Sequence, residues 1–319
     1  MARRALGPAT FTLVQAVDAA VGAADGTLVV ACSGGADSLA LAYATRQVGI
    51  RRGMAYAAVI IDHGLQPGSA GVAERVREQL SNGGFADVEV TRVGVDAGST
   101  GGPEAAARKA RYAALGQAAR ARSGVVLLGH TLDDQAETVL LGLARGSGLR
   151  SLAGMTQRTG PLIRPLLDTR RTATAQACGE IGWSPWSDPQ NEDPRFTRVR
   201  VRQSVLPILE RELGPGIAQA LVRTAALARD DADLLDELAV EADPGTDELG
   251  VQELLALAPA LRSRVIRRWL TRQGAVGVER EHVLRIEVLL SGWRGQGVVD
   301  LPGVGVRRVR GNLQIRLPP

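Results

Sequence analysis

A glycine-rich stretch near the N-terminus has the composition of an anion-binding loop. Residues 29–44 read VVACSGGADSLALAYA, where an apolar run leads through SGGADS into a helical pattern. Amide groups at the start of a helix point outward at its positive end, and glycine lets a phosphate approach the backbone closely. The residues expected to bind nucleotide phosphates are Ser33, Gly34, Gly35, Ala36 and Ser38.

Asp37 is a carboxylate inside this loop. Beside phosphates, a carboxylate makes chemical sense if it holds a divalent cation, so we expect Asp37 to bind Mg²⁺ and to be catalytic. For two glycines alone, a tight turn in which Asp37 caps the helix is an equally good explanation. Neither GxxxxGKS/T nor GxGxxG occurs in the sequence, which excludes a Walker loop and a dinucleotide-binding loop.

Three carboxylates open another expected helix, in GHTLDDQAETVLLG at residues 129–142. Spacings of three and four residues place Asp133 and Asp134 on the same side as Glu137. Acidic residues at a helix N-terminus often only complement the helix dipole. Three together, directly after a strand end that carries His130, favour a metal or a cationic substrate, so we expect all three to be catalytic.

Two arginine-rich segments add candidate substrate ligands. In PEAAARKARYAAL, Glu104, Arg108 and Arg111 lie four and three residues apart, which suits one binding face or a set of surface ion pairs. The segment DPQNEDPRFTRVRVRQSVLP suits phosphate contacts or a solvated face. Its arginines are Arg195, Arg198, Arg200 and Arg202.

The histidines and tryptophans each allow two interpretations. His63 and His130 follow expected strands and are candidate nucleotide ligands, although a hydrogen-bonded structural imidazole is at least as common. Trp183, Trp186 and Trp293 could stack on bases, but buried anchors are the more frequent role.

Strands and helices alternate in the part of the chain that carries these residues. Apolar strands separated by helices indicate a parallel sheet covered on both faces. We predict an α/β fold with a doubly wound, mostly parallel, Rossmann-like sheet that binds ligands beyond the carboxyl ends of its strands. The expected strands span 27–32, 54–62, 87–95 and 124–130, and the expected helices span 37–49, 69–84 and 103–123.

The chain is long enough for two domains, because a domain usually has about 100–200 residues and this sequence has 319. Strand signals thin out after residue 199, and Gly214–Pro215–Gly216 breaks a helical region. We predict a nucleotide-binding catalytic domain at 1–213, a helical linker at 214–250 and a small, mainly helical domain at 251–319. A basic helix in the small domain suits a contact with nucleic-acid phosphates through Arg262, Arg264, Arg267, Arg268 and Arg272.

Composition favours a cytoplasmic protein. The two cysteines, Cys32 and Cys178, form no CxxC pair, which argues against a disulfide scaffold, an iron–sulfur cluster or a zinc ribbon. No run approaches the roughly 18 apolar residues of a membrane span, and residues 1–26 lack the apolar core of a signal peptide. A net charge of +4 permits a polyanionic partner but is weak evidence for one.

The loop resembles the PP-loop of the ATP pyrophosphatases, which splits ATP between its α and β phosphates and leaves AMP on an acceptor. With DHGLQ, EAAARKARYAAL, GHTLDDQAETVLLGLARGSGLRSLAGM, IRPLL and DPQNEDPRFTRVRVRQSVLP, in this order, the chain is similar to the tRNA(Ile)-lysidine synthetase family over about its first two thirds. The chain departs from the family pattern at Gln66, where arginine is usual, and at Val199, where asparagine is usual.

This resemblance implies ATP and Mg²⁺ as cofactors, with L-lysine and a tRNA(Ile) bearing a CAU anticodon as partners. It implies no membrane partner and leaves a homodimer open. The wobble cytidine would be adenylated on its C2 oxygen, and free lysine would then displace AMP. Other PP-loop enzymes, such as the GMP, asparagine and NAD synthetases or the tRNA thiolases, are alternatives, as is a noncatalytic ATP- and RNA-binding module.

Residue roles follow from this chemistry as hypotheses. Among Glu104 and the three carboxylates at 133–137, some would bind the lysine ammonium group or a metal, and one would take a proton from the attacking amine. Arg108 and Arg111 would meet phosphate or the lysine carboxylate. Arg198, which we expect to be catalytic, and Arg202 would hold the tRNA backbone or the activated base.

Overall fold

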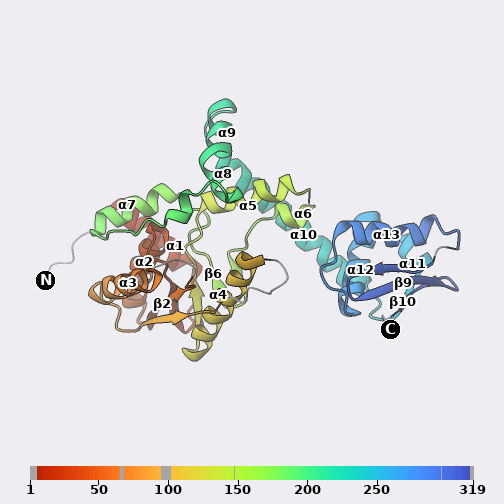
Figure 1. Cartoon of the computed structure of the whole chain (residues 1–319), viewed down its shortest axis with the longest axis horizontal. Helices are drawn as coiled ribbons and strands as arrows, with labels where there is room; N and C mark the ends of the chain where they lie inside the picture. Colours follow the sequence, from red (N-terminus) through yellow and green to blue (C-terminus); the bar gives the residue numbers. More distant parts are fainter. Residues whose placement is uncertain (1–5, 65–67, 95–101, 147, 296, 317–319) are drawn as a thin grey trace. The chain divides into compact units, whose positions relative to one another are not determined.

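The structure, a computed structural model, describes residues 6–64, 68–94, 102–146, 148–295 and 297–316 (Figure 1). The chain forms two compact units, Met1–Ala144 with Gly154–Arg223 and Arg145–Ala153 with Thr224–Pro319. The division falls within helix α10 (Ile217–Ala242). In these described ranges, no helix is both long and apolar enough to span a bilayer.

The first unit is built on a six-stranded sheet of order β3–β2–β1–β4–β6–β5, in which only the β5–β6 pair is antiparallel. The chain runs outward from β1 to β3 and then forms β4 on the other side of β1. The topological switch point, where such sheets bind ligands, therefore lies between β1 and β4. The strands are β1 (Thr27–Ala31), β2 (Tyr56–Asp62), β3 (Val88–Arg92), β4 (Gly124–Leu127), β5 (Arg158–Thr159) and β6 (Leu162–Ile163).

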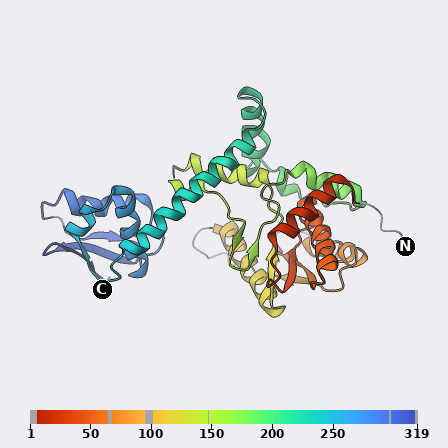
Figure 2. The same ribbon diagram turned by 180° about the vertical axis from the view of Figure 1, so that it is seen from behind.

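Apolar side chains on both faces of the sheet hold helices against it. In β1, Leu28 and Val30 join one core while Val29 and Ala31 join the other, as the two-residue period of a strand requires. Each fully buried leucine or valine stabilises the fold by about 1.5–3 kcal/mol. The first core packs against α1 (Pro8–Ala20), α2 (Ala36–Arg52), α3 (Ser69–Asn82) and α7 (Arg171–Ile181), and the second against α4 (Gly102–Ala121) (Figure 2).

A helix with one widened turn lies towards the end of this unit. Helix α8 (Thr197–Arg200), the π-helical turn η2 (Val201–Val205) and α9 (Leu206–Glu212) follow one another without a break. Single π-helical turns are frequent at functional sites, and this one carries Arg202 four residues after Arg198. Residues at this spacing project to the same side of a helix.

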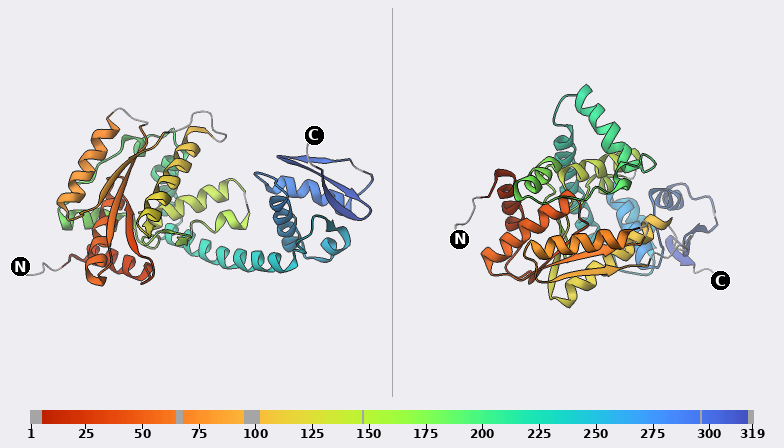
Figure 3. Two further views of the ribbon diagram at one scale, coloured as in Figure 1. Left: turned by 90° about the horizontal axis from the view of Figure 1, so that it is seen from below. Right: turned by 60° about the vertical axis from the view of Figure 1, so that its left-hand side comes forward.

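The second unit has its own core around Trp269, which is fully buried and donates its indole N–H to the carbonyl of Asp247 (3.0 Å). Helices pack on one face of its four-stranded antiparallel sheet, β7–β10–β9–β8 (Figure 3). Arg310 and Gly311, between β9 and β10, both have positive φ (48° and 87°), as a type I′ hairpin turn requires. Its elements are α6 (Leu149–Leu152), β7 (Leu249–Gly250), α11 (Val251–Ala256), α12 (Pro259–Arg272), α13 (Arg280–Ser291), β8 (Val299–Leu301), β9 (Val304–Val309) and β10 (Asn312–Arg316).

The predicted fold class is confirmed, because a mostly parallel, doubly covered sheet is joined to a smaller unit of helices and short strands. Each of β1 to β4 lies inside its expected run. Strands β5 and β6 escape prediction because two residues carry no readable periodicity.

Candidate active site

The phosphate-binding loop follows β1 and leads into α2. Gly34 has a φ of 86°, and a Cβ there would lie 2.4 Å from Cγ2 of Val76, so this position requires glycine. The Ser38 hydroxyl accepts a hydrogen bond from the Ser33 amide (3.1 Å) and donates one to the Gly35 carbonyl (2.9 Å). No described side chain caps α2 at Gly35, so the first amides of α2 can bind an anion.

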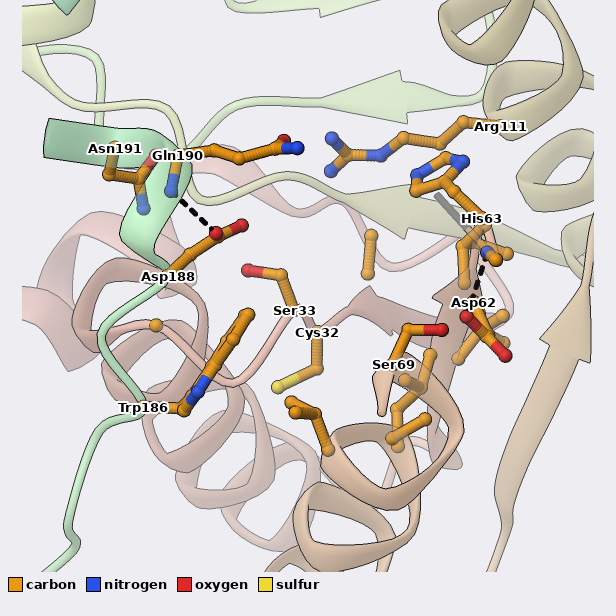
Figure 4. Close-up of a pocket in the computed structure, with 18 residues that line it drawn as sticks. Cys32, Ser33, Asp62, His63, Ser69, Arg111, Trp186, Asp188, Gln190 and Asn191 are labelled. Atoms are coloured by element: carbon orange, nitrogen blue, oxygen red, sulfur yellow. Dashed lines mark hydrogen bonds between the residues drawn. The ribbon is translucent and has the colours of Figure 1, made fainter. Parts of the chain in front are cut away.

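A cavity of about 330 Å³ opens beside the loop (Figure 4). The ends of β1 and β2 and one face of α3 line it, and the opposite wall is residues 186–191, which include the 3-10 turn η1 (Pro189–Glu192). The Trp186 amide donates to the Gly34 carbonyl (2.9 Å), which ties this wall to the loop. A cavity of this size, with apolar and polar lining side chains, can hold a nucleoside.

Arg111 brings a cation to this cavity. It reaches in from α4 beside His63 (Figure 4) and makes no ion pair with any residue in the described ranges. Burial lowers the pKa of Arg111, a cost that an anionic ligand would offset. Arg108 lies instead over the ring of Tyr112, with its guanidinium carbon 5.0 Å from the ring centroid. The two arginines thus have different immediate neighbours, the Tyr112 ring for Arg108 and the cavity for Arg111.

Next to the loop, three carboxylates and three guanidinium groups form what we call the charge cluster. At its centre is Glu137 of α5 (Leu132–Ala144), which has no exposed surface and accepts a 2.7 Å hydrogen bond from Nε of Arg198 and another from Nε of Arg202. Guanidinium–carboxylate bonds of this length are strong because both partners are charged. The cluster consists of Asp37, Asp134, Glu137, Arg171, Arg198 and Arg202.

Arg171, at the start of α7, joins the cluster to the phosphate-binding loop. It contacts Asp134 (2.8 Å), Asp37 (3.3 Å) and Glu137 (3.4 Å). Burial opposes the ionised form of Asp134, but Arg171 and the Thr131 amide outweigh it and hold the pKa of Asp134 below its usual range. In Asp37 burial prevails and raises the pKa, although the Thr174 hydroxyl and Arg171 bond to this carboxylate.

Asp133 points away from the cluster. Its carboxylate accepts a hydrogen bond from the Arg171 amide (2.7 Å) at the first turn of α7 and pairs with Arg170 (3.2 Å). Asp134 turns inward, and its Oδ2 also accepts from the Thr131 amide (2.8 Å). Two adjacent carboxylates thus have different surroundings, one at the end of a neighbouring helix and one in the charge cluster.

His130 lies beside Asp134 at the end of the β4 segment. Its Nδ1 is buried without a hydrogen-bond partner in the described part of the chain, and burial lowers the pKa of His130 to about 4. The imidazole is therefore neutral at physiological pH and can accept a hydrogen bond from a ligand.

Protonation of His130 should destabilise the fold in acid. Because the folded-state pKa lies below the usual value of about 6.5, the unfolded chain binds the proton more tightly, and stability falls as pH drops from about 6.5 to 4. We expect a His130→Asn variant to lose about 2 kcal/mol less stability than the wild type between pH 7 and pH 4.5. Urea unfolding at the two pH values measures this difference, and equal losses in both proteins would show that His130 is not buried in its neutral form.

Several site residues escape the sequence patterns. Arg171 and Thr174 reach Asp37 from more than 130 positions further along the chain, and no spacing rule connects them, although the arginine pair after IRPLL was a visible signal. The 186–191 wall is likewise brought to the loop by tertiary contact. The side chain of Glu104 and the whole of Gln66 lie outside the described residues, and Val199 is buried.

Asp37 suits a Mg²⁺ ion that is bound mainly by substrate phosphates, rather than a metal site built of protein ligands alone. Within the described ranges, no three His, Cys, Asp or Glu side chains converge to hold a metal. Mg²⁺ usually binds one or two carboxylates together with water and substrate phosphates. Asp37 is the carboxylate in the phosphate-binding loop itself, so it offers this kind of ligand.

Comparison with known proteins gives consistent matches along the chain. Residues 11–209 match the model of a PP-loop domain, and residues 249–314 match that of the TilS substrate binding domain. The chain is 51% identical to a tRNA(Ile)-lysidine synthase from Leifsonia xyli subsp. xyli, over 91% of this chain and 90% of the relative. The corresponding enzyme from Thermobifida fusca is 54% identical over 87% of this chain and 88% of its own length.

A solved structure supports the fold alone. The U34-tRNA thiolase NcsA from Methanococcus maripaludis superposes with a TM-score of 0.58 at 17% sequence identity, covering 69% of this chain and 80% of the thiolase. Because a shared fold does not fix the chemistry, the roles within the site must be assigned from its own residues.

Proposed function

We infer the function of this chain from one premise, that it belongs to the tRNA(Ile)-lysidine synthase family. It is a ligase of the PP-loop class that uses ATP and acts on tRNA(Ile) to form lysidine. The observation that best supports residue roles is the meeting of two sites at the switch point of the sheet. The phosphate-binding loop follows β1, the charge cluster follows β4, and Asp37 belongs to both.

In the first step, the C2 oxygen of the wobble cytidine in a CAU anticodon attacks the α-phosphorus of ATP. The oxygen–phosphorus bond forms while the bond to the bridging oxygen breaks, and pyrophosphate leaves. The amides of α2, with Ser33 and Ser38, bind the phosphates, and the adjoining cavity receives the adenosine. Asp37 would hold Mg²⁺, which supplies positive charge to the leaving pyrophosphate.

Arg111 and His63 contribute at the rim of the same cavity. The Arg111 guanidinium, which has no ion-pair partner among the described residues, binds an anionic substrate group, either an ATP phosphate or the lysine carboxylate. Burial lowers the pKa of His63, as does the Arg111 charge beside it, so His63 acts as a neutral hydrogen-bonding group next to the nucleotide.

In the second step, the lysine amine attacks C2 of the adenylated cytidine. The new carbon–nitrogen bond replaces the bond to oxygen, AMP leaves, and the proton lost by the nitrogen passes to the departing AMP phosphate or to water. Asp134 and Glu137 are paired with guanidinium groups, which makes both carboxylates weak bases, and we assign them to the binding of the lysine ammonium group rather than to proton abstraction. We assign Asp133 a supporting role, since its carboxylate caps α7.

We propose that tRNA contacts the second unit through the β9–β10 hairpin. The basic helix expected to serve this purpose, α12, is partly neutralised, because Arg264 pairs with Asp236 and Arg272 pairs with Asp243. Exposed arginines of the hairpin make no ion pairs with described residues and so can bind phosphates. These hairpin arginines are Arg307, Arg310 and Arg316.

Neutralising the hairpin arginines should weaken tRNA binding and flatten its salt dependence. Each lost phosphate contact lowers the slope of log K against log salt by about one, so a triple Arg→Gln variant should lose about three. Filter binding at several salt concentrations measures the slope. The control, Arg272→Gln, should keep the wild-type slope because Asp243 already neutralises that arginine. An unchanged slope in the triple variant would remove the hairpin from the tRNA contact.

We also propose a cytoplasmic location. Both cysteines are free, buried thiols, as is usual in a reducing compartment. A homodimer remains a proposal that light scattering at micromolar concentration would test.

The function itself is tested with purified protein, ATP, Mg²⁺, labelled lysine and unmodified tRNA(Ile) with a CAU anticodon. We expect one AMP for each lysine incorporated, and no incorporation into a matched tRNA with uridine at the wobble position. AMP formation without lysine transfer would indicate another acceptor chemistry.

A further inference from the structure

Arg171 lies between the proposed ATP site and the proposed lysine site. Its Nε contacts Asp37 (3.3 Å), its Nη2 contacts Asp134 (2.8 Å) and its Nη1 contacts Glu137 (3.4 Å). Among the residues that the structure describes, it is the one cation within 4 Å of all three carboxylates. Each of its three guanidinium nitrogens thus contacts a carboxylate that the proposed mechanism uses to bind Mg²⁺ or lysine.

Within the charge cluster, this arrangement leaves no free anion for the lysine ammonium group. The three carboxylates of the charge cluster are balanced by three guanidinium groups. The Asp134 side chain is only 12% exposed and that of Glu137 is fully buried. A further cation brought into this cluster would lack a counter-charge, and a buried unpaired charge is costly.

We propose that Arg171 is an exchangeable counter-ion that closes the lysine site until ATP binds. The inference rests on the proposed function. The ATP phosphates would arrive beside Asp37, where they offer the guanidinium a new anion with which it pairs well. When Arg171 turns to the phosphates, Asp134 and Glu137 become available to the ammonium group. This order suits the chemistry, because lysine has no electrophile to attack before the cytidine is adenylated.

Arg171 therefore acts as a positioning residue that couples two binding sites. Such coupling typically changes the affinity for the second ligand between 5-fold and 150-fold. If the lysine site is open in only a small fraction of molecules, the apparent affinity for lysine falls in proportion to that fraction. Arg170 is the matched control, since it adjoins Arg171 but pairs with Asp133 and bonds to Gln219, outside the charge cluster.

Calorimetric titration of lysine into the full-length protein tests the coupling. The titration is done with and without Mg²⁺ and α,β-methylene-ATP, an analogue that cannot be cleaved between its α and β phosphates. In the wild type, the nucleotide should tighten lysine binding by about tenfold. Arg171→Gln should bind lysine about tenfold more tightly than the wild type without nucleotide and gain less than about twofold from it. Arg170→Gln should behave as the wild type does.

Two other results would overturn the coupling while leaving lysidine synthesis intact: equal lysine affinity in the wild type with and without nucleotide, or full coupling in Arg171→Gln. Weaker lysine binding by Arg171→Gln in both states would instead make Arg171 a structural residue. Lysine binding in no state by any variant would overturn the lysine site itself. If circular dichroism shows that Arg171→Gln does not fold, Arg171→Lys is used instead. This variant keeps the positive charge and should preserve at least about threefold coupling between nucleotide and lysine. A complete loss of coupling in Arg171→Lys would refute the proposal.

Discussion

Asp37→Asn should lower the rate of AMP formation by about a thousandfold, which is the size of effect expected when a group that stabilises transition-state charge is removed. Asp37 is the one carboxylate of the phosphate-binding loop, and asparagine keeps its shape without its charge. The fold should tolerate the change, because burial raises the pKa of Asp37 and so disfavours the charged form that asparagine replaces. Chromatographic measurement of AMP with saturating ATP and tRNA gives the rate.

The control for Asp37 is Asp133→Asn, which removes a neighbouring carboxylate that caps α7. It should slow AMP formation no more than about tenfold while costing about 1 kcal/mol of stability through the weakened cap. Near-normal AMP formation by Asp37→Asn, or an equal loss in both variants, would show that Asp37 has no special role at the phosphates.

Glu137→Gln should lose lysine transfer by about 10²–10³-fold and also lower the free energy of unfolding by about 3 kcal/mol. The glutamate is fully buried and accepts the short hydrogen bonds of Arg198 and Arg202, so its neutral replacement leaves these two arginines with only their longer contacts to the Asp134 carboxylate (3.7 and 3.5 Å) for charge balance. Labelled lysine incorporation measures the first effect, and urea unfolding the second.

Glu210→Gln separates the two effects of the Glu137 substitution. Glu210 accepts hydrogen bonds from the amides of Gly216, Ile217 and Ala218 at the start of α10, outside the charge cluster. Its substitution should cost about 1 kcal/mol and leave lysine transfer unchanged. If Glu137→Gln were as stable as the wild type and transferred lysine at the normal rate, the charge cluster would not be the lysine site.

Local chemistry predicts much of this molecule. A glycine-rich loop between an apolar strand and a helix predicts an anion site whatever lies elsewhere, and Gly34 confirms the need for glycine through its positive φ. Near-continuous apolar strands require cover on both faces, which predicts the doubly wound sheet. These inferences succeed because each depends on neighbours within a few residues.

The direction in which a side chain points, and the residue with which it pairs, depend on tertiary contacts that sequence patterns do not predict. Asp133 and Asp134 are both acidic residues at one helix start, and their spacing does not reveal which one faces the cluster. Arg171 acquires its partners from two distant segments. The arginines of α12 read as a free basic face, whereas Asp236 and Asp243 from outside that helix neutralise part of it.

The proposed mechanism requires ATP to adenylate the C2 oxygen of the wobble cytidine before lysine attacks C2. The most direct test uses tRNA(Ile) assembled with ¹⁸O at C2 of that cytidine, followed by mass spectrometry of the released AMP. In the proposed reaction, the C2–oxygen bond breaks when lysine attacks, so the label should appear in the phosphate of AMP, one atom for each lysine transferred. AMP without the label, alongside normal lysine transfer, would show that the oxygen of AMP comes from elsewhere and would contradict adenylation at C2.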